Sequence, residues 1–120
     1  MRKLIFVFVT FCATTSVQAA ELTVRGFINY HDASEDGRHM SEIMIGSAGS
    51  AFGWANSRLD FENRAQLYCE PKSLRLTNSQ YFDIFRQYAE GSSGAMSEHS
   101  NMKEYFLLMG LKSTFPCSTE

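Results

Sequence analysis

The first 19 residues constrain the fold most, because their pattern predicts a secretory leader that the working protein loses. Arg2 and Lys3 supply positive charge, and residues 4–13 form an apolar run without a charged side chain. Val17 and Ala19 then place branched or small residues at the −3 and −1 positions of a cleavage site. A membrane-spanning helix needs about 20 apolar residues, roughly twice the length of this run. We expect cleavage after Ala19, and no membrane anchor in what remains.

The remaining chain, residues 20–120, is expected to form one domain with two cysteines. The leader takes Cys12 with it, and Cys12 is a poor lipoprotein cysteine because the bulky Phe11 precedes it. In an oxidising compartment the remaining pair, Cys69 and Cys117, is expected to form a disulfide, and two unpaired thiols are the alternative. In the chain-entropy model this closure stabilises a fold by about 4 kcal/mol. No histidine lies at ligand spacing from either cysteine, so no metal site is expected.

Charge and motifs argue against several classes of function. The chain has 11 basic and 13 acidic side chains, and the leader removes two basic ones, which leaves a net charge of −4. This mildly acidic balance argues against nucleic-acid binding. No metalloprotease helix motif, serine-hydrolase elbow or phosphate loop occurs, so we expect neither a cofactor nor an enzyme. His31 beside Asp32 is interpreted as a solvated turn.

Apolar residues recur at three- and four-residue steps, which predicts an all-α fold without strands. The predicted helices cover residues 22–32, 38–61 and 76–91, and a last one begins at about residue 97 or 101 and ends at 113. A turn is predicted at 34–37. Thr77 with Gln80 and Asn101 with Glu104 have capping-box spacing. The aromatic face of the third helix is expected in the core. The result is a small four-helix domain in which the predicted disulfide clamps the last two helices into a hairpin.

The helix predicted over residues 38–61 is rich in small residues. Met40, Met44 and Phe52 are among the residues that predict its buried face. Each glycine inside a helix costs nearly 1 kcal/mol relative to alanine, so close approach of another helix should compensate. The alternative is a helix that is broken near Gly49 and followed by a loop up to Gly53. If the approaching helix belongs to a second copy of the chain, the candidate dimer interface is Gly46, Gly49, Ser50 and Gly53.

The segment that joins the last two predicted helices has the composition of a binding loop. It consists of Gly91, Ser92, Ser93, Gly94, Ala95, Met96, Ser97, Glu98 and His99. Its glycines expose backbone N–H groups, its serines add hydroxyls, and Met96 is an adaptable apolar contact. Such a loop can enter a partner's cleft, although composition alone favours a flexible connector.

These features together resemble the type VI secretion immunity proteins of the Tai/Rap kind. The resemblance rests on Cys69-Glu70-Pro71, Phe115-Pro116-Cys117, the exported chain and its small-residue helix. It implies a periplasmic, all-helical, disulfide-bonded protein, commonly a homodimer, that binds and blocks a cognate peptidoglycan-degrading effector. It also implies that the loop over residues 91–99 enters the effector's active-site groove, and that the small-residue helix lies at the dimer interface.

Several alternatives stay open at the level of sequence. The effector can be a muramidase or an amidase, and a loop of neutral donors suits a carboxylate-lined muramidase cleft slightly better. A periplasmic acid-stress chaperone is the second hypothesis, because such proteins are also small, helical, dimeric and single-disulfide. A small lytic enzyme is the third, since two of the scattered carboxylates could form a catalytic pair.

Overall fold

The computed structural model describes residues 22–118, and these fold into four α-helices without a strand. The helices are α1 (Val24–Ala33), α2 (Glu35–Phe61), α3 (Asn78–Gly91) and α4 (Lys103–Thr114), with short 3₁₀ turns η1 (Ala95–Ser97) and η2 (Ser100–Met102). This confirms the predicted all-α, four-helix domain. The predicted leader lies outside the described residues. Among those that are described, no helix combines the length and apolar character that a membrane span requires.

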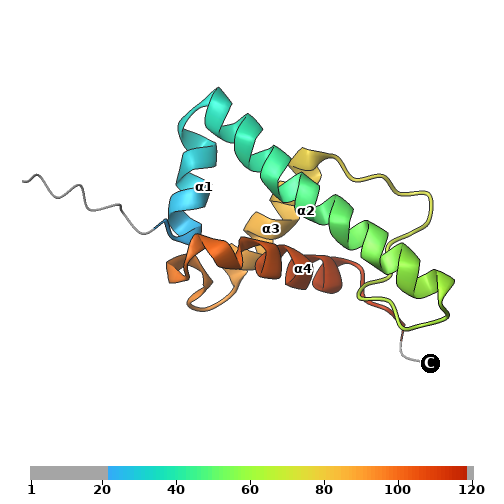
Figure 1. The fold of residues 1–120 in the computed structure, drawn as a ribbon. Helices are drawn as coiled ribbons and strands as arrows, with labels where there is room; N and C mark the ends of the chain where they lie inside the picture. The colour runs from blue at the N-terminus through green and yellow to red at the C-terminus, as the bar shows by residue number, and fades with distance from the viewer. Residues whose placement is uncertain (1–21, 119–120) are drawn as a thin grey trace, which may run out of the picture.

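The longest helix, α2, runs diagonally across the whole molecule (Figure 1). The short helix α1 packs beside its N-terminal half, and α3 crosses behind it. The last helix, α4, lies against α3 and also reaches α2. The connection from α2 to α3, residues 62–77, returns along the far end of the molecule (Figure 1). The η1 and η2 turns lie at the opposite end, near the start of α1.

The ends of the helices follow from capping side chains. The hydroxyl of Ser34 accepts a hydrogen bond from the backbone N–H of Gly37 at 2.9 Å, so residues 34–37, predicted as a turn, are the start of α2. The capping box at the start of α3 is confirmed, with both the Thr77 hydroxyl and the Gln80 amide engaged. The second predicted box is wrong, because η2 precedes α4 and the N-cap residue of α4 makes no side-chain hydrogen bond.

The core is built around the aromatic face of α3, as predicted. Phe82 and Phe85 are buried, and both rings contact Phe27 of α1, with ring centroids 6.1 and 5.9 Å away. The remaining buried apolar side chains are Val24, Ile28, Ile45, Tyr68, Tyr81, Ala89, Ala95, Phe106, Leu107 and Leu111. Every helix therefore contributes to one core.

The helix α2 is continuous, as predicted, but its buried face is only partly the predicted one, because Phe52 packs against the core and the two methionines do not. Met40 and Met44 are exposed, whereas Ser41, Gly46 and Gly49 face the core. The reason is the close passage of α3. A Cβ atom added to Gly46 would lie 2.0 Å from the side-chain oxygen of Asn78, and one added to Gly49 would lie 2.4 Å from the ring of Tyr81.

Close approach of another helix is therefore confirmed, but the helix is α3 of the same chain. Gly46 and Gly49 are buried inside the protein, and neither can contact a second copy as part of a dimer interface. The other two candidate residues differ from them. Ser50 is exposed, and a Cβ atom added to Gly53 would have nothing within 4 Å.

Two alanine substitutions in α2 test this packing. We expect Gly49→Ala to lower the free energy of unfolding by about 1–2 kcal/mol, because the clash with Tyr81 outweighs the gain in helix propensity. Gly53→Ala is the matched control in the same helix, and it should raise the stability by about 1 kcal/mol, since the added methyl meets open space. Urea unfolding followed by circular dichroism measures both. Equal stabilisation by the two variants would contradict the close approach.

The predicted disulfide is formed, between Cys69 and Cys117, with their Cα atoms 4.8 Å apart. The backbone N–H of Cys69 also donates to the carbonyl of Phe115 at 2.8 Å. On the other side, the Asn56 amide of α2 donates to the carbonyl of Tyr68 at 2.6 Å and accepts from the N–H of Leu67 at 2.7 Å. These contacts attach the long connection to both α2 and the end of α4.

Candidate partner-binding site

The segment over residues 91–99 is a folded element rather than a loose connector. The Ser92 hydroxyl donates a hydrogen bond to the carbonyl of Tyr88 at 2.7 Å, which attaches the start of the segment to the last turn of α3. The backbone then turns at Gly94, whose φ of 80° is in the region that favours glycine. The hydroxyl of Ser97 donates back to the Gly94 carbonyl at 2.8 Å, which closes the η1 turn.

The far side of this segment is attached to the start of α1. The backbone N–H of Val24 donates to the carbonyl of Glu98 at 2.9 Å, and that of Ser100 donates to the carbonyl of Leu22 at 2.7 Å. Thr23, just before α1, and His99, between η1 and η2, form an isolated antiparallel β-bridge. Both ends of the segment are therefore fixed to helices that belong to the core.

The nine predicted site residues divide into anchors and exposed groups. Ala95 is 3 % exposed, and Met96 packs against the core cluster, so the structure uses Met96 to hold the segment in place. The exposed residues are Gly91, Ser93, Gly94, Ser97, Glu98 and His99. They present backbone groups, hydroxyls, one carboxylate and one imidazole on one protruding turn.

A groove of about 340 Å³ lies directly beside this turn. Tyr88, Tyr105 and Phe106 provide aromatic groups on its wall, and Glu98 provides a carboxylate. Tyr105 is 49 % exposed, so its ring is accessible from the groove. The turn and the groove together offer a protruding element and an aromatic recess on one surface.

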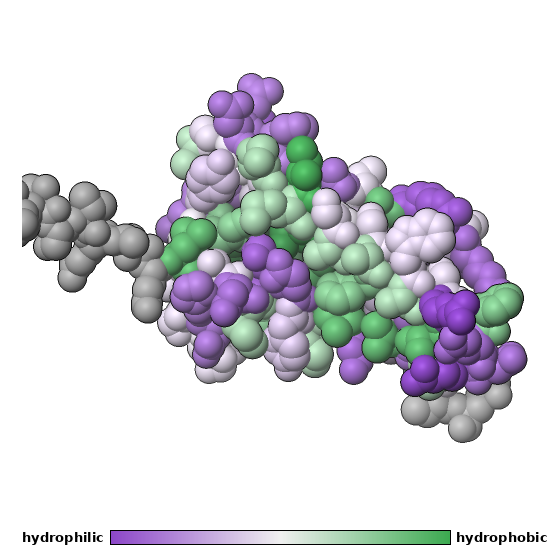
Figure 2. Space-filling model, in the orientation of Figure 1, coloured by the Kyte–Doolittle hydropathy of each residue, from purple (hydrophilic) through white to green (hydrophobic). Residues whose placement is uncertain are grey.

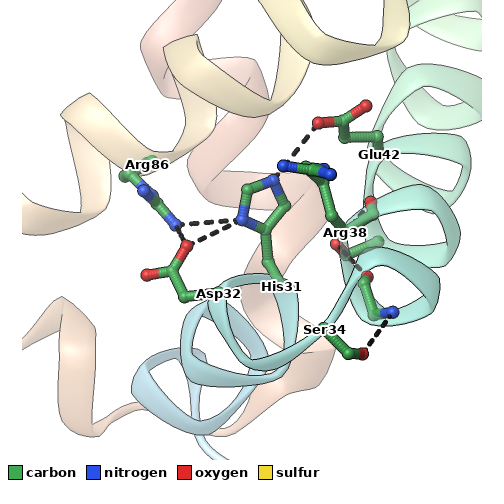
Figure 3. A network of polar contacts seen from close by, with 8 residues as sticks. His31, Asp32, Ser34, Arg38, Glu42 and Arg86 are labelled. Atoms are coloured by element: carbon green, nitrogen blue, oxygen red, sulfur yellow. Dashed lines mark hydrogen bonds and ion pairs between the residues drawn. The ribbon is translucent and has the colours of Figure 1, made fainter.

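Sequence reasoning missed a polar cluster that joins three helices (Figure 3). His31 of α1 lies with Nδ1 2.8 Å from Asp32 Oδ1 and with Nε2 3.3 Å from a carboxylate oxygen of Glu42 on α2. Its ring stacks on Phe82 with centroids 3.9 Å apart, and Arg86 of α3 binds Asp32. The interpretation of His31 as part of a solvated turn is wrong, because its side chain is only 12 % exposed.

The charged groups of this cluster link α1, α2 and α3 to one another. Hydrogen bonds from Arg86 and then from His31 hold the pKa of Asp32 below its ordinary value. The cluster therefore stabilises the fold at pH values above the ordinary pKa of an aspartate. This stabilisation is lost as the pH falls through the lowered pKa of Asp32. The gain is small because Asp32 is 53 % exposed and water screens the pair. Among residues 22–118, no three metal-ligating side chains come together.

The sequence held no signal for this cluster. Glu42 lies 11 residues and Arg86 lies 55 residues from His31, so only the packing of three helices brings them together. Comparison with known proteins adds no further assignment, because no protein-family model, curated protein or solved structure matches this chain.

Proposed function

We propose that this protein is a periplasmic immunity protein that binds a peptidoglycan hydrolase and occludes its active site. The observation that carries the proposal is the turn over residues 91–99, which is hydrogen-bonded to α3 at one end and to the start of α1 at the other, and which leaves Ser93, Gly94 and Glu98 exposed. A loop held in its bound shape loses little conformational entropy on binding, so more of its contact energy appears as affinity.

The exposed groups of the turn fit the active-site groove of an enzyme that cleaves the glycan strands or the peptides of peptidoglycan. The exposed backbone at Gly94 and the hydroxyl of Ser93 are neutral groups that can bind carboxylates or a catalytic dyad, whereas the Ser97 hydroxyl donates its proton to the Gly94 carbonyl. Glu98 would be repelled by a catalytic carboxylate, so we assign it to an arginine or histidine at the rim of the groove. The neutral donors favour a muramidase slightly over an amidase.

The predicted leader and the disulfide both agree with a periplasmic location. A protein that intercepts a cell-wall hydrolase has to be present beside the wall, which the predicted leader would achieve. The periplasm is oxidising, and the Cys69–Cys117 disulfide suits that compartment.

The test takes any hydrolase encoded next to this chain as the candidate effector, and measures its inhibition by the clearing of purified peptidoglycan. We expect the mature protein to abolish clearing at about an equimolar ratio. Ser93→Trp places a large side chain on the exposed turn and should raise the concentration for half-inhibition at least about 30-fold, as expected for a binding hot spot. Ser73→Trp is the matched control, since Ser73 is an exposed serine of the connection over residues 62–77, which lies at the opposite end of the molecule from η1 and η2 (Figure 1).

Three results would overturn the proposal. Inhibition by Ser93→Trp that equals the wild type would remove the turn from the mechanism. Clearing of peptidoglycan by the protein alone would indicate a lytic enzyme. Suppression of client aggregation at acidic pH, without binding to the hydrolase, would indicate a chaperone.

A further inference from the structure

A second groove lies between the C-terminal half of α2 and the connection over residues 62–77. The larger part of this connection groove has a volume of about 530 Å³ and the smaller part about 320 Å³, as in small-molecule sites. The two parts are continuous, because both are lined by Gly53, Ser57, Glu70, Leu74 and Arg75. Figure 2 shows pale and hydrophilic residues mixed where α2 meets this connection, so the surface is neither apolar nor uniformly charged.

The wall of the larger part includes Trp54, which is the only tryptophan of the sequence. Trp54 is 79 % exposed, so the core of the chain makes little use of its ring. An exposed indole beside polar groups offers a flat apolar face with hydrogen-bonding partners around it. A pyranose ring fits this arrangement, because its C–H groups pack on an aromatic face while its hydroxyls point to the sides.

Two charged side chains of the connection groove are available to such hydroxyls. The ion pairs within residues 22–118 include neither Glu70 nor Arg75. Burial raises the pKa of the Glu70 carboxyl, and the nearby charge of Arg75 partly opposes this rise. The two groups are therefore neighbours in the groove. A carboxylate that accepts hydrogen bonds beside a guanidinium that donates them suits adjacent hydroxyls of a sugar.

The connection that carries these two charged residues is ordered by its own contacts. Cys69, which precedes Glu70, forms the disulfide with Cys117. The backbone N–H of Leu74 donates to the carbonyl of Pro71 at 2.9 Å, which closes a turn between the two charged residues. A wall held in this way loses little conformational entropy when a ligand binds.

Gly53 keeps space open in both parts of the connection groove. A Cβ atom added to Gly53 would have nothing within 4 Å, whereas one added to Gly46 or Gly49 would clash with α3. The packing of the chain therefore does not require glycine at position 53. Because a glycine inside a helix lowers its stability relative to alanine, an occupant of this space is a reason to keep it.

We propose that the connection groove binds a short N-acetylated saccharide. In the bound state a sugar ring stacks on Trp54, and its hydroxyls form hydrogen bonds with Glu70 and Arg75. The methyl of an acetamido group packs against Leu74 and Leu76, which line the same part of the groove. The site thus uses an aromatic face, a charged pair and an apolar wall for three different parts of one ligand.

Other classes of small ligand fit the connection groove less well. An anionic ligand would meet the carboxylates of Glu70 and Asp60. A purely apolar ligand would remove water from charged groups without replacing their hydrogen bonds. The inference does not rest on the proposed function, because the connection lies at the opposite end of the molecule from η1 and η2 (Figure 1).

Titration with chitotetraose, an oligomer of N-acetylglucosamine, tests the inference through the fluorescence of Trp54. Because the chain has no other tryptophan, the signal reports on this groove. We expect a saturable shift of the emission to shorter wavelength as the sugar covers the indole. Maltotetraose has the same number of sugar units without acetamido groups, and it should bind at least about tenfold more weakly, as expected when an apolar contact is lost.

Calorimetric titration of variants with chitotetraose identifies the groups that bind. Trp54→Ala should raise the dissociation constant at least about tenfold, as the loss of a central aromatic contact does. Phe61→Ala is the matched control, since Phe61 is also 79 % exposed on α2 and does not line the groove. Arg75→Ala should raise the dissociation constant about tenfold, whereas Arg64→Ala, at an exposed arginine of the same connection, should not.

Gly53→Leu separates binding from folding. Its side chain occupies the open space of the groove, so we expect the dissociation constant for chitotetraose to rise at least about tenfold. The midpoint of urea unfolding should not fall, because the added atoms meet no other part of the chain. Ala55→Leu, at an exposed alanine of α2 outside the groove, is the matched control and should bind as the wild type does. Ser93→Trp, which tests the proposed function, should also bind chitotetraose normally, so the two proposals can fail separately.

The inference is overturned if chitotetraose gives no saturable response, or if Trp54→Ala and Gly53→Leu bind it as the wild type does. Equal affinity for maltotetraose would contradict an N-acetylated sugar. Binding of free lysine without binding of either sugar would assign Glu70 and Arg75 to a zwitterionic ligand, and it would also overturn the saccharide site.

Discussion

Replacing both Cys69 and Cys117 with serine is expected to lower the free energy of unfolding by about 4 kcal/mol. The two cysteines are 48 positions apart, and opening so long a loop releases a large amount of conformational entropy in the unfolded chain. Typical domains have a total stability of about 5–15 kcal/mol, so the variant should be close to its unfolding threshold at 37 °C.

Urea unfolding followed by circular dichroism at neutral pH measures this loss. The control is the wild-type protein unfolded in the presence of a reductant, and its midpoint should coincide with that of the double serine variant. The contacts of Asn56 with the carbonyl of Tyr68 and the N–H of Leu67 are retained, so we expect the helices to form when the variant is folded. A loss below about 1 kcal/mol would show that these contacts order the connection without the disulfide.

Phe82→Ala is expected to lower the free energy of unfolding by about 4 kcal/mol, within the range for a large aromatic ring removed from a core. The Phe82 side chain is 1 % exposed, and its ring contacts Phe27 and Phe85. The ring of His31 stacks on it, and the guanidinium of Arg86 lies 5.3 Å from its centroid. The substitution removes apolar core and the support of the polar cluster together.

Phe61→Ala is the control for Phe82→Ala. Phe61 ends α2 with 79 % of its surface exposed, so we expect its removal to change the stability by less than about 0.5 kcal/mol. Thermal unfolding of both variants at one low protein concentration makes the comparison. Similar losses for the two phenylalanines would contradict the core described here.

Much of the local structure could be predicted because its causes are local. The Thr77–Gln80 capping box, the start of α3 and its aromatic core face depend on residues within a few positions of one another. The pairing of Cys69 with Cys117 could be predicted by elimination, once Cys12 was assigned to the leader. The candidate binding segment over residues 91–99 was identified by composition.

The way this segment is held could not be predicted. Its rigidity depends on hydrogen bonds from Val24 and to Leu22, which are more than 70 positions away in the chain. The same is true of His31, whose partners come from α2 and α3. Spacing rules describe neighbours on one helix, and they carry no information about the helices that pack against it.

The helix α2 separates most clearly what the sequence predicts from what only the tertiary structure decides. By itself the sequence predicted a helix over residues 38–61 that mixes small residues with large apolar ones, because periodicity and propensity act within one segment. Only the tertiary structure decided which residues face inward, namely Gly46 and Gly49 together with the large apolar Ile45. Tyr81 and Asn78 approach α2 so closely that glycine alone fits beneath them, and this turns Met40, Met44 and Trp54 outward. Steric exclusion at two glycines acts together with the burial of Ile45 to set the orientation of α2, the longest helix within residues 22–118.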